Sequence, residues 1–206
     1  MQSDWAAENL QTIRTLMERA AVYRRALAPI MTAVGAIGIV AALIGCRLEM
    51  HTSRAFVAYW MGASVVALAA AFLLVRRQAM HDAEPFWSLP TRRVAQALAP
   101  SFFAGLMLGT PFLHFDPNLD GVCVLIPAWM ILYGCALHSA GFFISRGIKL
   151  FGWGFVVCGC GVGFAVLSRG FQFSFDPNWA MGVFFGGGHA ACGIYLFFTE
   201  KRRNAT

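Results

Sequence analysis

Six long apolar segments constrain the fold of this chain more than any other feature. Each is close to the roughly 20 residues that a helix needs to cross the hydrocarbon core of a bilayer, and none contains Asp or Glu. Backbone groups in lipid must hydrogen-bond within their own segment, so the segments should be helical. The sequence therefore predicts an all-α integral membrane protein with six transmembrane helices, at residues 26–46, 55–75, 97–114, 121–145, 148–168 and 178–199.

Composition supports a membrane protein over a soluble one. Of 206 residues, 58% are hydrophobic and 13% are charged, whereas soluble domains carry about 25% charged residues. A soluble fold of this size could not cover so much apolar surface. We expect one membrane domain over residues 26–199, preceded by residues 1–25 and followed by a basic tail, 200–206.

The basic residues predict the orientation. Cytoplasmic loops of membrane proteins carry an excess of Lys and Arg, and 13 of the 16 basic residues fall on one side of the predicted spans. This places both termini in the cytoplasm of a bacterial-type inner membrane. Because these residues lie at the ends of apolar runs, they indicate topology, and we expect no direct binding of nucleic acid. The cytoplasmic set is Arg14, Arg19, Arg24, Arg25, Arg76, Arg77, Arg92, Arg93, Arg146, Lys149, Lys201, Arg202 and Arg203.

Short motifs recur along the chain. An Ala-Leu-Ala-Pro stretch follows an Arg pair near the start of the first and third segments, and the second and fourth segments both contain Trp-Met. Repeats of this kind are a structural signature first. We expect three tandem helical hairpins.

A Phe-Asp-Pro-Asn tetrapeptide occurs twice, each time ahead of an apolar segment. Asp and Asn side chains cap the first amides of a helix, and Pro is tolerated in its first turn. We expect outer-face helix caps at Asp116, Asn118, Asp176 and Asn178.

Glycines four residues apart indicate where helices pack closely. Gly105 and Gly109, Gly159 and Gly163, and Gly182 and Gly186 each share a helix face. Small residues let helix backbones approach in lipid. The pairs could serve contacts within one bundle or between two copies of the chain.

Two cytoplasmic segments are candidates for binding a partner. Residues 1–25 predict an amphipathic helix, with apolar residues at helical spacing that include Leu10, Ile13 and Met17. Such a helix lies on the membrane surface or docks a cytosolic protein or a second copy of the chain. The predicted loop 78–91 contains Trp87, which suits either the headgroup layer or a partner.

Four residues suggest a metal or haem site. Cys135 and His138 share a face of the fourth segment, and His189 and Cys192 share a face of the sixth. If those faces met, two thiols and two imidazoles would form a tetrahedral metal site, or two histidines would hold a haem iron. The structural alternative is that each histidine donates one hydrogen bond to a neighbouring helix and that the cysteines are ordinary core residues.

No familiar catalytic signature occurs, and the absence of Asp and Glu from all six spans counts against a proton- or sodium-coupled carrier. The leading hypothesis is a non-enzymatic interaction, sensor or scaffold subunit with a cytoplasmic partner surface. The alternatives are a haem- or metal-binding redox protein and a passive transporter for a small neutral solute.

Overall fold

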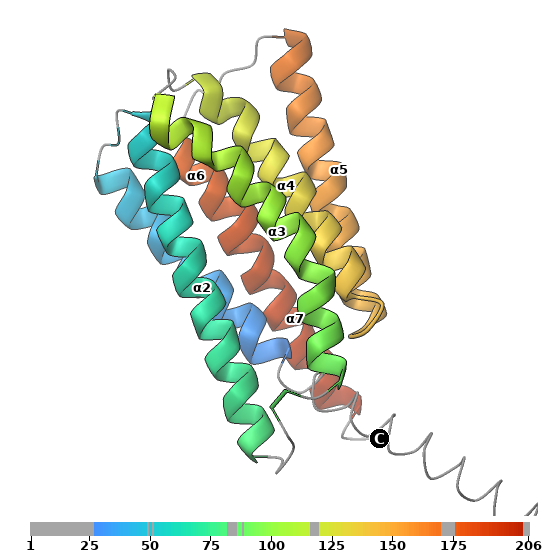
Figure 1. The fold of residues 1–206 in the computed structure, drawn as a ribbon. Coiled ribbons are helices and arrows are strands. Elements are labelled where there is room, and N and C mark those ends of the chain that lie inside the picture. The colour runs from blue at the N-terminus through green and yellow to red at the C-terminus, as the bar shows by residue number, and fades with distance from the viewer. Residues whose placement is uncertain are drawn as a thin grey trace, which may run out of the picture.

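The computed structural model describes residues 27–48, 50, 52–81, 86–87, 89–115, 120–169 and 176–203, and within these ranges it contains helices and turns but no strand. Six helices are long and apolar enough to cross a membrane, as expected. They run side by side as a bundle (Figure 1). The helices are Leu27–Arg47, α2 (Ser53–His81), α3 (Leu89–Phe115), α4 (Asp120–Ala140), α5 (Arg146–Arg169), and a rod made of α6 (Pro177–Met181), the π-helical segment η1 (Gly182–Gly187) and α7 (Gly188–Arg203).

The structure differs from the predicted boundaries at both ends of the loop 78–91 and at the end of the fourth span. Helix α2 continues to His81 and α3 begins at Leu89. Both ends of the expected loop 78–91 are therefore helical, and the loop is shorter than predicted. Arg and Gln are good helix formers, so residues 76–78 carry the helix past the apolar run. Helix α4 ends at Ala140 rather than near 145, because Phe142 and Phe143 donate their backbone N–H groups to Ser139 and Ala140 in a tight turn.

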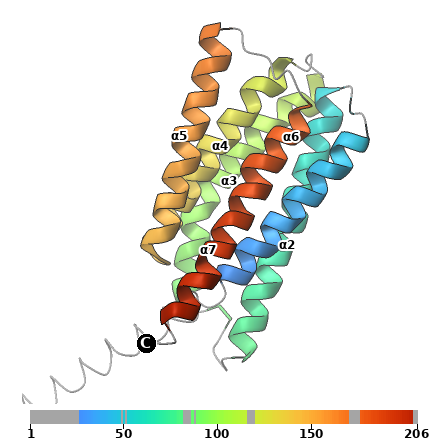
Figure 2. The ribbon, with the colours of Figure 1, turned by 180° about the vertical axis from the view of Figure 1, so that it is seen from behind.

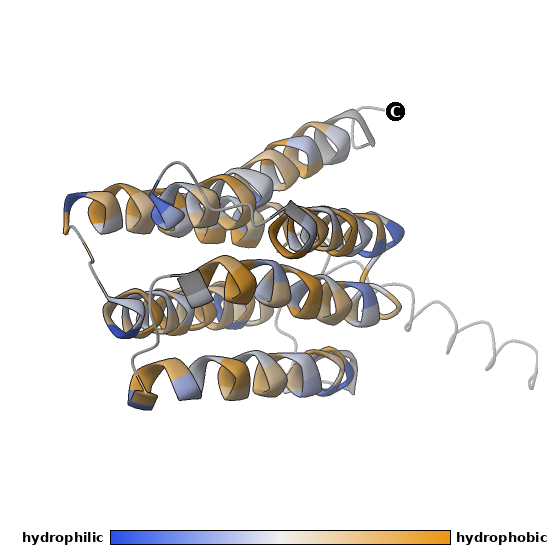
Figure 3. Cartoon of the chain, turned by 90° about the horizontal axis from the view of Figure 1, so that it is seen from above, coloured by the Kyte–Doolittle hydropathy of each residue, from blue (hydrophilic) through white to orange (hydrophobic). Residues whose placement is uncertain are grey.

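Hydrophilic residues concentrate toward the helix ends, and the middle of the bundle is apolar (Figure 3). One end, here called the basic end, is where α2 and α7 finish, α3 starts, and α4 turns into α5 (Figure 1). The opposite end, here called the capped end, holds the start of α6. The exposed basic side chains of the basic end are Arg76, Arg77, Arg92, Arg93 and Arg146.

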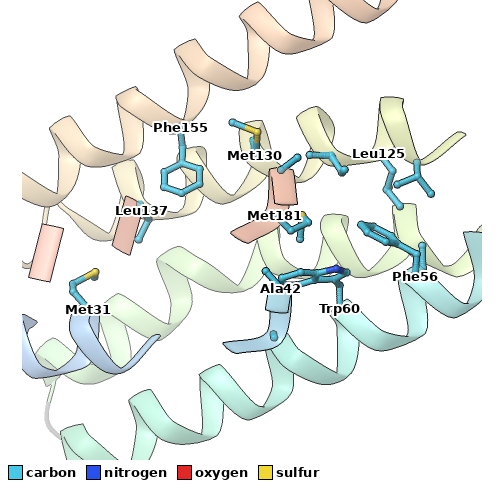
Figure 4. Close-up of a cluster of buried hydrophobic side chains, with 14 of the residues drawn as sticks. Met31, Ala42, Phe56, Trp60, Leu125, Met130, Leu137, Phe155 and Met181 are labelled. Atoms are coloured by element: carbon cyan, nitrogen blue, oxygen red, sulfur yellow. The ribbon is translucent and has the colours of Figure 1, made fainter. Parts of the chain in front are cut away.

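Helix α4 lies at the centre of the bundle. Half of the α4 span is buried, compared with 6% of the span Thr91–Phe115, so α3 lies at the edge. The core side chains come from all of the other spans except α3 and meet α4 over much of its length (Figure 4). They include Met31, Ala42, Phe56, Trp60, Leu125, Met130, Leu137, Phe155 and Met181.

The first helix packs against the C-terminal rod at backbone contact (Figure 2). A Cβ added to Gly38 would lie 2.8 Å from the Cα of Gly186, and one added to Gly182 would lie 2.5 Å from the Cβ of Ala42. A Cβ on Gly35 would collide with the backbone of Ala190. The expected role of Gly182 and Gly186 in close packing is confirmed, and Gly35 and Gly38 are their unanticipated partners.

Helices α4 and α5 form a second seam of this kind. A Cβ on Gly134 would lie 2.6 Å from the carbonyl oxygen of Gly152, and one on Gly159 would lie 3.1 Å from that of Pro127. Contacts therefore join α4 to α5 as well as to α3. The three expected hairpins remain a prediction.

Candidate functional site

His189 is the most deeply buried ionisable side chain among the residues that the structure describes, with 1% of its surface exposed. Its Nδ1 lies 2.5 Å from the carbonyl oxygen of Phe185, and its Nε2 lies 2.5 Å from the hydroxyl of Tyr133. A carbonyl oxygen only accepts, so Nδ1 carries the proton and donates it. In the neutral ring Nε2 then accepts from Tyr133. Both ring nitrogens are therefore hydrogen-bonded.

Aromatic rings enclose this Tyr133–His189 pair. The His189 ring centroid lies 5.2 Å from that of Phe151 and 5.7 Å from that of Phe155, both on α5. Phe102 of α3 stacks on Tyr133 at 6.0 Å. The pair thus joins α4 to the rod inside an apolar shell, where an unpaired polar group would be costly.

The π-helical segment η1 ends two residues before His189. The backbone N–H of Gly188 bonds to the carbonyl of Val183, five residues back instead of four. A wider turn changes which side of the helix the following residues occupy, so it helps aim His189 at α4. Such segments are rare and often occur at functional sites. The only signal for this segment in the sequence is the Gly186-Gly187-Gly188 run.

His138 has a different environment near the end of α4. Its ring lies between Phe142 at 5.3 Å and Trp153 at 5.7 Å, both close to perpendicular to it. Its Nδ1 is buried and has no hydrogen-bond partner among the described residues. Cys135, one turn earlier, is exposed on the outside of the bundle.

The structure does not bring the four proposed ligands together. No three His, Cys, Asp or Glu side chains in the described part of the chain form a group that could hold a metal ion. The residue of α4 that faces His189 is Tyr133, and His138 lies five positions further on, about 140° around the helix. Cys192 is half-buried on α7, whereas Cys135 faces outward. The residue spacing within each helix was predicted correctly. The face of α4 that carries Cys135 and His138 does not meet the face of α7 that carries His189 and Cys192.

The second Phe-Asp-Pro-Asn stretch forms a polar connection at the capped end. Asp176 caps α6, and its carboxylate accepts from the backbone N–H and the side-chain amide of Asn178, each at 2.8 Å. Asn178 was also expected to be a cap. It lies instead in the first turn, 1% exposed, and its Oδ1 accepts from the indole of Trp60 at 2.8 Å. Asp116 and Asn118 lie outside the described residues.

Two further aromatic donors reach neighbouring helices. The indole of Trp129 donates to the carbonyl of Gly105 on α3 at 2.9 Å, and the hydroxyl of Tyr59 donates to the carbonyl of Ala41 on the first helix. The repeated Trp-Met motif marks two of these donors, but Trp60 and Trp129 bind unlike partners. We did not predict these bonds, because the acceptors come from distant parts of the sequence.

Of the four candidate partner-binding residues, the structure describes Trp87. Its side chain is 61% exposed, beside Phe86, whose ring packs on Phe72 of α2 at 4.8 Å. This anchored turn follows the end of α2 and so lies at the basic end. Leu10, Ile13 and Met17 lie outside the described residues.

Comparisons with protein-family models, with curated proteins and with solved structures found no match to this chain.

Proposed function

We propose that this chain is a non-enzymatic interaction, sensor or scaffold subunit of a bacterial-type inner membrane, with both termini in the cytoplasm. Its partner would be a cytosolic protein that contacts the basic end. The observation that carries the proposal is that exposed basic side chains and the exposed Trp87 share this end of the bundle. The six helices are compatible with a multi-pass membrane protein.

The chemistry of the two ends supports this choice. Arg76 and Arg77 project from the end of α2, and Arg92 and Arg93 from the start of α3, on either side of the Phe86–Trp87 turn. Aromatic and Arg side chains are the residues most enriched at protein interfaces. The positive-inside rule favours the cytoplasm for this end. The three-hairpin origin remains part of the proposal, on the strength of the sequence repeats alone.

The interior offers less support for chemistry or transport. Both nitrogens of His189 are engaged, and the polar groups of Tyr59, Trp60 and Trp129 are engaged with other helices. These bonds fix the bundle and leave its distinctive exposed polar groups at the ends. A subunit that works through its surface fits this arrangement best.

The test is site-specific photo-crosslinking in membranes. A crosslinking amino acid at position 87 should capture a protein, and the same residue at position 48, which is 58% exposed at the capped end, should not. A reporter fused after Thr206 should show cytoplasmic activity. Capture of lipid alone at position 87 would refute the partner surface, and periplasmic reporter activity would refute the orientation.

A further inference from the structure

The turn between α4 and α5 places cations and aromatic rings at the boundary of two membrane spans. One span ends at Ala140 and the next begins at Arg146, so residues 141–145 fall at the depth of lipid headgroups. Arg146 is exposed, and the Nζ of Lys149 lies 3.7 Å from the centroid of the Phe142 ring. Residues three apart share a helix face, so the two cations act on the same region.

Close backbone packing holds this turn in place. A Cβ on Gly141 would lie 2.7 Å from the backbone nitrogen of Lys149, and one on Gly152 would lie 2.6 Å from that of His138. Helix α5 therefore fixes the positions of Lys149 and His138 relative to each other. A preformed arrangement binds a ligand with a smaller ordering cost.

The last turn of α4 and the α4–α5 turn each contain one of the two buried side-chain polar atoms that lack a hydrogen-bond partner among the described residues. These are His138 Nδ1 and Ser145 Oγ. Buried polar groups are normally satisfied, so each such atom calls for an explanation. Of the acidic side chains that the structure describes, the sole one is Asp176, at the capped end. Both atoms are buried, so what the turn offers a ligand is positive charge, with no described carboxylate nearby.

Apolar surface continues from the turn along α5. Leu150 is 63% exposed and Trp153 is 53% exposed, while Phe142 is 64% exposed beside Lys149. Cations at headgroup depth beside exposed apolar side chains match a molecule with an anionic head and a hydrocarbon tail. A soluble anion would contact the cations but not the exposed apolar side chains.

We propose that the α4–α5 turn binds the phosphate headgroup of an anionic phospholipid. Arg146 and Lys149 attract the phosphate. The acyl chains lie along the exposed apolar side chains of α5. This goes beyond the proposed partner surface and requires no cytosolic protein.

The experiment is native mass spectrometry of the full chain in mild detergent, with phosphatidylglycerol or phosphatidylcholine added as the probe. Phosphatidylglycerol should be retained more strongly. Arg146→Gln combined with Lys149→Gln should weaken its retention about fivefold for each cation removed. The matched control is Arg76→Gln with Arg77→Gln, which removes the same charge from the same end and should leave retention unchanged.

The other outcomes would overturn the site. Equal retention of the two lipids would show that no anion is selected. Equal losses in both double variants would show diffuse attraction to the whole basic end. Displacement of phosphatidylglycerol by soluble glycerol 3-phosphate would show that the turn takes free phosphate esters and not a lipid. Unchanged far-ultraviolet circular dichroism confirms that each variant is folded; Arg76, Arg77 and Arg146 are exposed, and Lys149 is half-buried.

Discussion

His189 and His138 lie on transmembrane helices of the same bundle, and each has a cysteine three residues away, yet their surroundings differ. His189 faces Tyr133 and two phenylalanine rings, and both of its nitrogens are hydrogen-bonded. His138 faces two aromatic rings near the basic end, and its Nδ1 is unpaired among the described residues. The same local pattern therefore gives a structural connection in one place and a buried, unpaired ring nitrogen in the other.

Packing between the first helix and the rod explains much of this difference, because it fixes the rod that carries His189. Gly186 lies in this seam, where an added Cβ would be 2.7 Å from the backbone nitrogen of Ile39. Gly186→Leu should therefore separate the two helices and lower the free energy of unfolding by about 3 kcal/mol or more. Thermal unfolding in detergent measures the effect.

The matched control is Gly154→Leu. Gly154 is also a helical glycine, but nothing lies within 4 Å of an added Cβ there. It should leave the unfolding temperature nearly unchanged. Similar losses in both variants would mean that leucine harms any helix of this bundle, and that the seam has no special role.

Replacing each histidine tests the comparison directly. His189→Leu leaves the buried Tyr133 hydroxyl without its partner and should lower the free energy of unfolding by about 1–3 kcal/mol. His138→Leu removes a buried atom that has no partner, so in lipid-free neutral detergent its effect should be within about 0.5 kcal/mol. Parallel thermal melts of the two variants would decide, and equal losses would contradict the distinction.

Tyr133→Phe isolates the hydrogen bond from the packing around it. The aromatic ring stays against Phe102 and Phe155, and only the hydroxyl is lost. Hydrogen bonds between membrane helices contribute about 0.6 kcal/mol on average and rarely more than about 1.7. We expect a loss in that range by thermal unfolding. Tyr195→Phe is the control, since Tyr195 is 64% exposed and should tolerate the change.

Much of the fold could be predicted because a bilayer imposes a length and a polarity on each span. Which helix faces meet could not, because contacts depend on helices far apart in the sequence. Gly38 and Gly62 illustrate the limit: both interrupt apolar segments, but Gly38 touches the rod and Gly62 has nothing within 4 Å. The π-helical turn is a second limit. It changes the face on which His189 lies relative to α6, and the sequence gives no rule that places such a turn.

The smallest predicted effect concerns the two cysteines once grouped with these histidines. Cys135→Ala should have almost no effect, because lipid or detergent surrounds its exposed side chain, and Cys192→Ala should cost less than about 1 kcal/mol because its side chain is only half-buried. Since the two thiols share no partner in the structure, the double change should equal the sum of the single changes within about 0.5 kcal/mol. A shared metal would link them, so the double change would then cost less than that sum. Thermal unfolding with and without a chelator separates these cases, and additivity in both would leave His189 a structural residue.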